Sequence, residues 1–95
     1  MRFEWDEDKA ASNLAKHGVS FDEARTVFDD PLFLDYYDPD HSHDEHRFII
    51  VGQSREGRLL MVAYTERGDA VRLISSRTTT SEERRFYEGT KTRRS

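Results

Sequence analysis

Hydrophobic and polar positions near the start of the chain follow two different periods. Residues 2–5 alternate as in a short strand, whereas apolar side chains recur at helical spacing over residues 7–17. Asp6 is a favourable N-cap for this helix, and Gly18 is placed to end it as the C′ residue. The chain is therefore expected to begin with one strand and one helix.

A second helix is expected directly after the first. Ser20 and Glu23 have the spacing of a capping box, in which each side chain bonds the backbone N–H of the other residue. The helix should end at about Asp29, because Pro31 disfavours helical backbone at the residue before it. Its inward-facing residues are predicted to be Phe21, Ala24, Val27 and Phe28.

The apolar pattern changes to that of strands in the middle of the chain. Four strands are predicted, over residues 32–37, 47–53, 59–66 and 70–77. Residues 38–46 are polar and indicate a loop, while Gly57 and Gly68 mark two turns. In the last strand, one face should carry Val71, Leu73 and Ser75, and the other Arg72, Ile74 and Ser76.

The final segment is predicted to be a helix. Thr80 and Glu83 form a second capping box, the helix should run to about Glu88, and Gly89 should end it. Residues 90–95 are polar and basic, and they are expected to form a flexible tail.

This order of elements predicts an α+β fold. The two N-terminal helices should pack on one face of an antiparallel meander of three or four strands, and the C-terminal helix should close the structure. A chain of 95 residues has room for one modest core, so residues 1–95 are expected to form a single domain. The other face of the sheet, or its rim, is left for function.

Composition excludes several classes of protein. The chain has no cysteine, which excludes disulfides and thiolate metal sites, and no apolar run approaches the roughly 20 residues of a membrane span. The N-terminus lacks the apolar segment of a signal peptide, so a cytoplasmic location is expected.

The net charge of −4 is distributed unevenly. Residues 1–46 contain 4 Lys or Arg and 13 Asp or Glu, whereas residues 47–95 contain 11 and 6. Ten of the 11 cations in the second half are Arg, which favours bidentate contacts with phosphate or carboxylate groups. A solvated surface is the alternative interpretation.

Three blocks of residues resemble the BrnT family of type II toxins. The blocks are Phe3–Asp6 with Lys9 and Asn13; Lys16–Phe21 with Glu23, Ala24 and Phe28–Pro31; and Tyr64–Asp69 with Arg72–Arg77, Glu83, Arg84 and Tyr87. They span most of the chain in the family's order and spacing. The resemblance implies a RelE-like ribonuclease fold and an RNA substrate, and no cofactor is expected. It also implies a BrnA-type antitoxin as partner, a heterotetramer with that antitoxin, and contact with operator DNA only through it. The lack of a long apolar run, noted above, predicts no membrane partner.

RNA cleavage without a metal uses the substrate's own 2′-OH as the nucleophile. The protein then has to move two protons and neutralise charge on the phosphorane. Given the resemblance, the residues predicted to be catalytic are Glu66, Arg67, Arg77, His17 and Tyr87, and those predicted to bind RNA are Lys16, Arg72 and Arg84. In this hypothesis Arg67 and Arg77 bind phosphate at the ends of two adjacent strands, and Glu66 transfers a proton or orients an arginine.

Each candidate also has a structural explanation. Glu66 can form a cross-strand ion pair, and Lys16 and His17 can complement the dipole of a helix C-terminus. Phe86 is expected to dock the last helix on the sheet, and Tyr87 can do the same. The alternative function is a non-catalytic module on the same fold that binds RNA or an antitoxin.

The loop over residues 38–46 contains a candidate metal cluster. Its members are His41, His43 and His46 with Asp38, Asp40, Asp44 and Glu45. No rigid element fixes the geometry of these ligands, so a solvated acidic loop is favoured and no metal is expected. Residues 35–46 could instead pair with a basic segment of an antitoxin.

Overall fold

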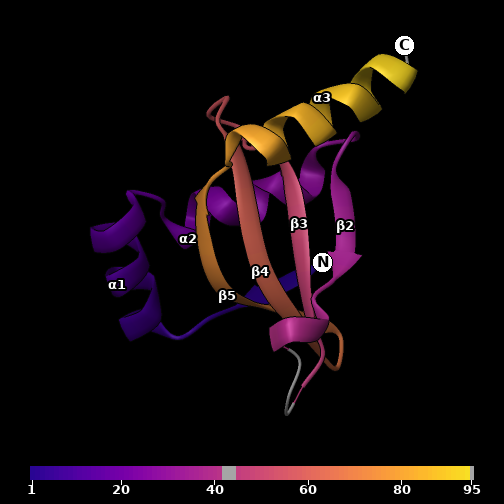
Figure 1. The fold of residues 1–95 in the computed structure, drawn as a ribbon. Helices are drawn as coiled ribbons and strands as arrows, with labels where there is room; N and C mark the ends of the chain where they lie inside the picture. Colours follow the sequence, from indigo (N-terminus) through magenta and orange to yellow (C-terminus); the bar gives the residue numbers. More distant parts are fainter. Residues whose placement is uncertain (42–44, 95) are drawn as a thin grey trace.

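A computed structural model describes residues 1–41 and 45–94, with side chains placed up to residue 89. Figure 1 shows the elements in chain order. They are β1 (Arg2–Glu4), α1 (Glu7–His17), α2 (Phe21–Ala24), the 3-10 helix η1 (Arg25–Asp29), β2 (Leu34–Tyr37), the 3-10 helix η2 (Pro39–His41), β3 (Arg47–Gln53), β4 (Leu59–Arg67), β5 (Ala70–Thr78) and α3 (Ser81–Arg94). Within the described ranges, no helix combines the length and the apolarity needed to cross a membrane.

The five strands form one mixed sheet in the order β1-β5-β4-β3-β2. From β2 to β5 the sheet is an antiparallel meander of four strands, as the pattern predicts. β1 pairs with β5 in parallel, with Phe3 opposite Val71, so the prediction of a purely antiparallel sheet is wrong at this edge. The alternation of residues 2–5 predicted the strand but not its partner. In the structure Phe3 of this strand packs against the core.

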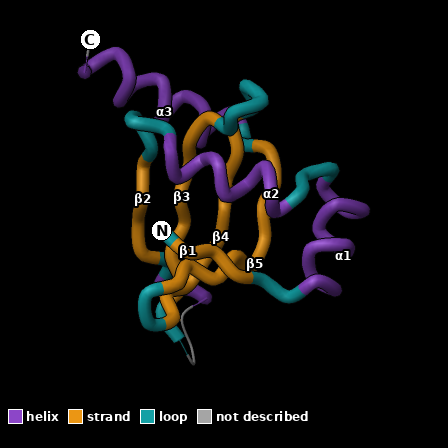
Figure 2. The backbone as a smooth tube through the Cα atoms, turned by 180° about the vertical axis from the view of Figure 1, so that it is seen from behind, coloured by secondary structure: helices purple, strands orange, loops and turns teal. Residues whose placement is uncertain are grey.

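Helices cover both faces of the sheet. α2 and η1 cross the strands on one face, and α1 packs on the same side against the outer edge of β5 (Figure 2). The core on that side is formed by Val19, Phe21, Ala24, Val27, Ile50, Leu60, Val62, Tyr64, Val71 and Leu73. α3 crosses one end of the opposite face, where Tyr87 packs with Ile49, Val51, Leu59 and Ala63 (Figure 1). The face left for function is therefore partly covered, and the uncovered part borders α3.

The second helix is shorter than expected. After the four residues of α2 the backbone tightens into η1, in which Thr26 donates to the carbonyl oxygen of Glu23 at 2.6 Å. Ser20 accepts from the Glu23 N–H at 3.0 Å, but the Glu23 carboxylate does not return the bond. It accepts instead from Ser54 and Arg58, which begin and end the turn before β4. Only half of the predicted capping box forms, because this ion pair competes for the carboxylate.

A bulge breaks the alternation of β5. Ala63 pairs with Ser75 and Tyr64 with Leu73, so Ile74 is the extra residue. As a result Ser76, not Ser75, follows Leu73 on the face covered by α1 and α2, and Ser76 is 1% exposed. Its backbone N–H and carbonyl both bond the buried amide of Asn13, at 3.0 and 2.9 Å, which fastens α1 to this edge of the sheet.

The last helix begins as predicted and ends later. Thr80 accepts from the Glu83 N–H at 3.2 Å, and the Glu83 carboxylate accepts from the Thr80 N–H at 2.9 Å, which is a complete capping box. The helix continues through Gly89 to Arg94, so the predicted stop at Gly89 is wrong. Gly89 has none of the positive φ that Gly18 shows at the end of α1.

Candidate active site

An arginine and a glutamate are fixed together where β5 leads into α3. Arg77 donates two parallel hydrogen bonds to the Glu83 carboxylate, at 2.8 and 3.0 Å. Glu83 is held in turn by the capping box with Thr80, and Arg77 also donates to the carbonyl oxygen of Thr78 at 3.1 Å. The fork geometry restricts both side chains, so the guanidinium has a defined position at the sheet surface. About a third of the Arg77 side chain remains exposed.

Tyr36 of β2 completes a cluster with this pair. It is paired with Ile49 in the sheet and is 47% exposed. Burial raises the pKa of the Tyr36 phenol, and the nearby charge of Glu83 raises it further. The hydrogen bond with Arg77 lowers the pKa of Glu83, and the same bond raises the pKa of Arg77. At neutral pH the cluster therefore presents a phenol, a carboxylate and a guanidinium.

A groove of about 480 Å³ adjoins the cluster. It lies between β2 and the first turns of α3 and is lined mainly by apolar atoms. The lining residues are Leu34, Asp35, Tyr36, Val51, Glu82, Glu83 and Phe86. A cation beside an open groove can bind an anionic ligand, and the adjacent phenol and carboxylate can exchange protons with it.

A sequence model of one protein family matches residues 5–83, and its description is "Ribonuclease toxin, BrnT, of type II toxin-antitoxin system". The chain belongs to this family. BrnT proteins are thus ribonuclease toxins, and membership in a type II system implies an antitoxin partner. The resemblance seen in the sequence is confirmed.

A solved structure supports the same fold. The chain resembles the 1.1 Å crystal structure of the Brucella abortus ribonuclease toxin BrnT, with a TM-score of 0.63. The match covers 85% of this chain and 99% of that one at 24% sequence identity, a level at which it shows the fold alone. No curated protein sequence matched the chain.

Glu66 and Arg67 were predicted to form one active site with Arg77, but the structure places them at opposite ends of the β4–β5 hairpin. Arg67 pairs with Ala70 at one end of the β4–β5 hairpin, whereas Arg77 pairs with Met61 near the other end. These positions are six residue steps apart along an antiparallel strand, a distance of about 20 Å. Glu66 and Arg67 therefore do not meet Arg77. Arg67 instead lies 3.5 Å from Glu45 in an exposed ion pair.

The remaining candidates surround β5. Arg72 is paired with Glu4 of β1 at 2.9 Å. Lys16 and His17, at the end of α1, line a shallow hollow with Ile74 and Ser75 of β5.

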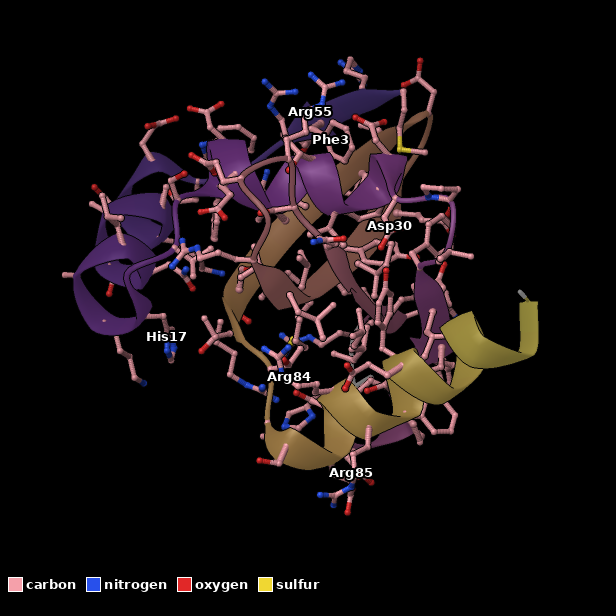
Figure 3. All side chains as sticks on the ribbon, turned by 90° about the horizontal axis from the view of Figure 1, so that it is seen from above. Phe3, His17, Asp30, Arg55, Arg84 and Arg85 are labelled. Atoms are coloured by element: carbon pink, nitrogen blue, oxygen red, sulfur yellow. The ribbon has the colours of Figure 1, made fainter. Side chains whose placement is uncertain are left out.

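Arg84 and Arg85 of α3 point in different directions, and Figure 3 shows Arg84 directed toward the sheet and Arg85 away from it. Arg84 lines a second hollow together with Arg58 and Tyr87.

Tyr87, and not Phe86, packs the last helix against the sheet. Tyr87 is 5% exposed and its hydroxyl donates to Asp30 at 2.5 Å. Burial raises the pKa of Tyr87, and the bond to Asp30 raises it further. Phe86 is 62% exposed and borders the groove, so the expectation that it docks the helix is wrong. The geometry favours docking by Tyr87, and its catalytic role stays a prediction.

The Tyr87→Phe variant tests this docking role. It removes one hydrogen bond to a carboxylate but keeps the ring, so we expect the free energy of unfolding to fall by about 1–2 kcal/mol. Denaturant titration followed by circular dichroism measures this change. An unchanged midpoint together with a loss of RNA cleavage would instead place the Tyr87 hydroxyl in catalysis.

Two residues of the cluster were missed by sequence reasoning although signals for them existed. Tyr36 lies two positions after Leu34 in a strand, and residues at that spacing share one face. Glu83 was recognised as a residue of the capping box of the last helix. That helix begins directly after a strand, so its capping carboxylate can also reach an arginine near the end of the strand.

The candidate metal cluster falls partly outside the described residues, because it includes His43 and Asp44. Of its other members, His41 bonds Asp38 at 2.9 Å and His46 contacts the Tyr37 hydroxyl at 3.3 Å. Among the described residues, no three metal-binding side chains form a group.

Two lowered glutamate pKa values predict acid sensitivity. Hydrogen bonds from Arg58 and Arg77 lower the pKa of Glu23 and Glu83 below the ordinary 4.5. A lowered folded-state pKa contributes stability above the unfolded value and loses it as pH falls through the folded value. We therefore expect the melting temperature to decrease as the pH is lowered below about 4.5. The decrease should be smaller in the Glu23→Gln/Glu83→Gln variant. Equal losses in both proteins would contradict the assignment.

Proposed function

We propose that this BrnT protein is a metal-independent endoribonuclease of the cytoplasm that inhibits translation and is neutralised by a BrnA-type antitoxin in a heterotetramer. The observation that supports a site beside α3 is Arg77, which is held by both oxygens of Glu83 yet is partly exposed next to Tyr36. A fixed arginine at an open groove is suited to a phosphodiester.

The chemistry follows from the charge states of the cluster. The 2′-hydroxyl attacks the adjacent phosphorus and the bond to the 5′-oxygen breaks, which yields a 2′,3′-cyclic phosphate and a 5′-hydroxyl. Arg77 neutralises the phosphorane. Tyr36 remains protonated because its pKa is raised, so it can donate a proton to the departing 5′-oxygen. The ionised Glu83 holds Arg77 and can accept the proton of the 2′-hydroxyl. The nucleophile belongs to the RNA, and no metal-bound water is required.

The other predicted residues fit an RNA path along β5. Lys16 and His17 flank its middle on the α1 side, and Arg84 reaches toward its end from α3. His17 keeps its proposed catalytic role, and Lys16 and Arg84 are proposed to contact phosphates, where each adds to affinity and to salt dependence. Arg72 is proposed to act in the same way once RNA competes with Glu4.

RNA cleavage by the purified chain in the presence of EDTA tests the proposal. We expect products with a 2′,3′-cyclic phosphate end from the wild type and their loss in the Tyr36→Phe variant. Cleavage that stops with EDTA would overturn the metal-independent mechanism.

The Glu66→Ala variant tests the alternative site at the other end of the hairpin. We expect it to cleave RNA like the wild type, because Glu66 lies about 17 Å along the strand from Arg77. Loss of cleavage in this variant alone would move the active site to the β4–β5 turn. RNA retention without cleavage by the wild type would favour the non-catalytic binding module.

A further inference from the structure

The groove between β2 and α3 has a composition that phosphate binding does not explain. Its floor contains Leu34 and Val51, and its walls carry the rings of Tyr36 and Phe86. These rings are 47% and 62% exposed, and Phe86 is the most exposed aromatic side chain among the described residues. Together the two rings give the groove an exposed apolar surface that a ligand with a flat apolar face can cover.

The position of the groove indicates which ligand this is. Glu83 lines it and holds Arg77, and Tyr36 belongs to both the groove and the cluster. A phosphate on Arg77 therefore places the neighbouring nucleoside of the same RNA at the groove. Unpaired bases are bound in this way on Tyr and Phe rings, because every base has a flat face that stacks.

A carboxylate at the rim adds selectivity for the base. Glu82 lines the groove and forms no ion pair or hydrogen bond within the described part of the chain. The two oxygens of a carboxylate can accept from two adjacent donors at once. Guanine presents such a pair, the N1–H and the N2 amino group, whereas adenine and cytosine present an amino group beside an acceptor and uracil presents one N–H.

We propose that this groove binds a guanine base next to the scissile phosphate, between Tyr36 and Phe86 and with its Watson–Crick edge on Glu82. The inference rests on the proposed ribonuclease function and adds a preference for RNA with guanosine beside the cut. A basic peptide segment is the other class of ligand that an acidic, apolar groove can accept.

Binding of the four nucleoside 3′-monophosphates tests the proposal without any cleavage. Isothermal titration of the wild type should show guanosine 3′-phosphate binding at least about tenfold tighter than the others, as expected for one good bidentate contact. The Glu82→Gln variant should lose most of this preference, and Phe86→Ala should weaken all four nucleotides.

Two matched variants control for charge and for apolar surface. Asp8→Asn removes a first-turn carboxylate from α1, as Glu82→Gln does from α3. Leu14→Ala removes an exposed apolar side chain from a helix, as Phe86→Ala does. Both controls should bind guanosine 3′-phosphate like the wild type. Equal affinity for the four nucleotides, or no binding that depends on Glu82 and Phe86, would overturn the proposal and leave the groove to a protein partner.

The two proposals fail in different ways. Cleavage of RNA that requires Arg77 but shows no preference for guanosine would refute the base site and leave the ribonuclease function intact. Selective binding of guanosine 3′-phosphate by a chain that cuts no RNA would refute the enzyme and leave the base site.

Discussion

Replacing Arg77 by alanine is expected to reduce RNA cleavage about 100- to 1000-fold, the usual effect of removing one well-placed donor to a developing negative charge. Arg77 is the member of the cluster that carries positive charge, and Glu83 fixes its two terminal nitrogens. Its alignment is therefore prepared before substrate arrives. The rate of appearance of the 2′,3′-cyclic phosphate product, measured at saturating RNA, gives this loss directly.

Three further variants separate chemistry from folding in this experiment. Arg77→Lys keeps the charge but not the fork, so we expect only partial recovery of the rate. Glu83→Gln breaks the ion pair and removes the proposed proton acceptor but keeps the guanidinium, so a loss of at least about 100-fold is expected there as well. Arg55→Ala is the matched control, because Arg55 is an exposed arginine bonded to a carboxylate, Asp29, on the side of the molecule away from α3 (Figure 3). A folded Arg77→Ala protein that cuts at the wild-type rate would contradict the assignment.

The local parts of this fold were readable from the sequence. Caps at Ser20 and Thr80 predicted where two helices begin, and strand patterns predicted the meander. These features depend on neighbouring residues. The pairing of β1 with β5 and the bulge at Ile74 depend on contacts between distant segments, and no local pattern encodes them.

The candidate site was only partly predictable for a similar reason. Arg77 was found, but it was grouped with Arg67 because both lie near strand ends. In an antiparallel hairpin the end of one strand lies beside the start of the other, so topology alone could have separated them. The choice between Phe86 and Tyr87 could not be made in advance, because both are helical neighbours of Glu83. The bond from Tyr87 to Asp30 decides it, and that bond joins distant parts of the chain.

Replacing Arg58 by alanine is expected to lower the free energy of unfolding by about 3 kcal/mol, because it leaves the buried carboxylate of Glu23 without its charged partner. Glu23 is 7% exposed, and its carboxylate accepts from Arg58 and from Ser54, the latter at 2.7 Å. Arg58 also donates to the carbonyl oxygen of Gly18 at the end of α1. The pair thus joins α1, α2 and the turn before β4.

The two partners should not contribute equally, and the asymmetry is the sharper test. The Arg58 side chain is 41% exposed, so it can be solvated when Glu23 is neutralised. Glu23→Gln should therefore cost only about 1–2 kcal/mol. The Glu23→Gln/Arg58→Ala variant should be more stable than Arg58→Ala alone, because it buries no charge.

In Arg58→Ala the pKa of Glu23 should rise, so the stability lost relative to wild type should shrink as pH approaches 4.5. Urea unfolding of all four proteins at neutral pH and at that pH measures both effects. Two results would contradict this account. One is a loss of unfolding free energy in Arg58→Ala that is no greater than in Glu23→Gln, and the other is a loss that increases as the pH is lowered.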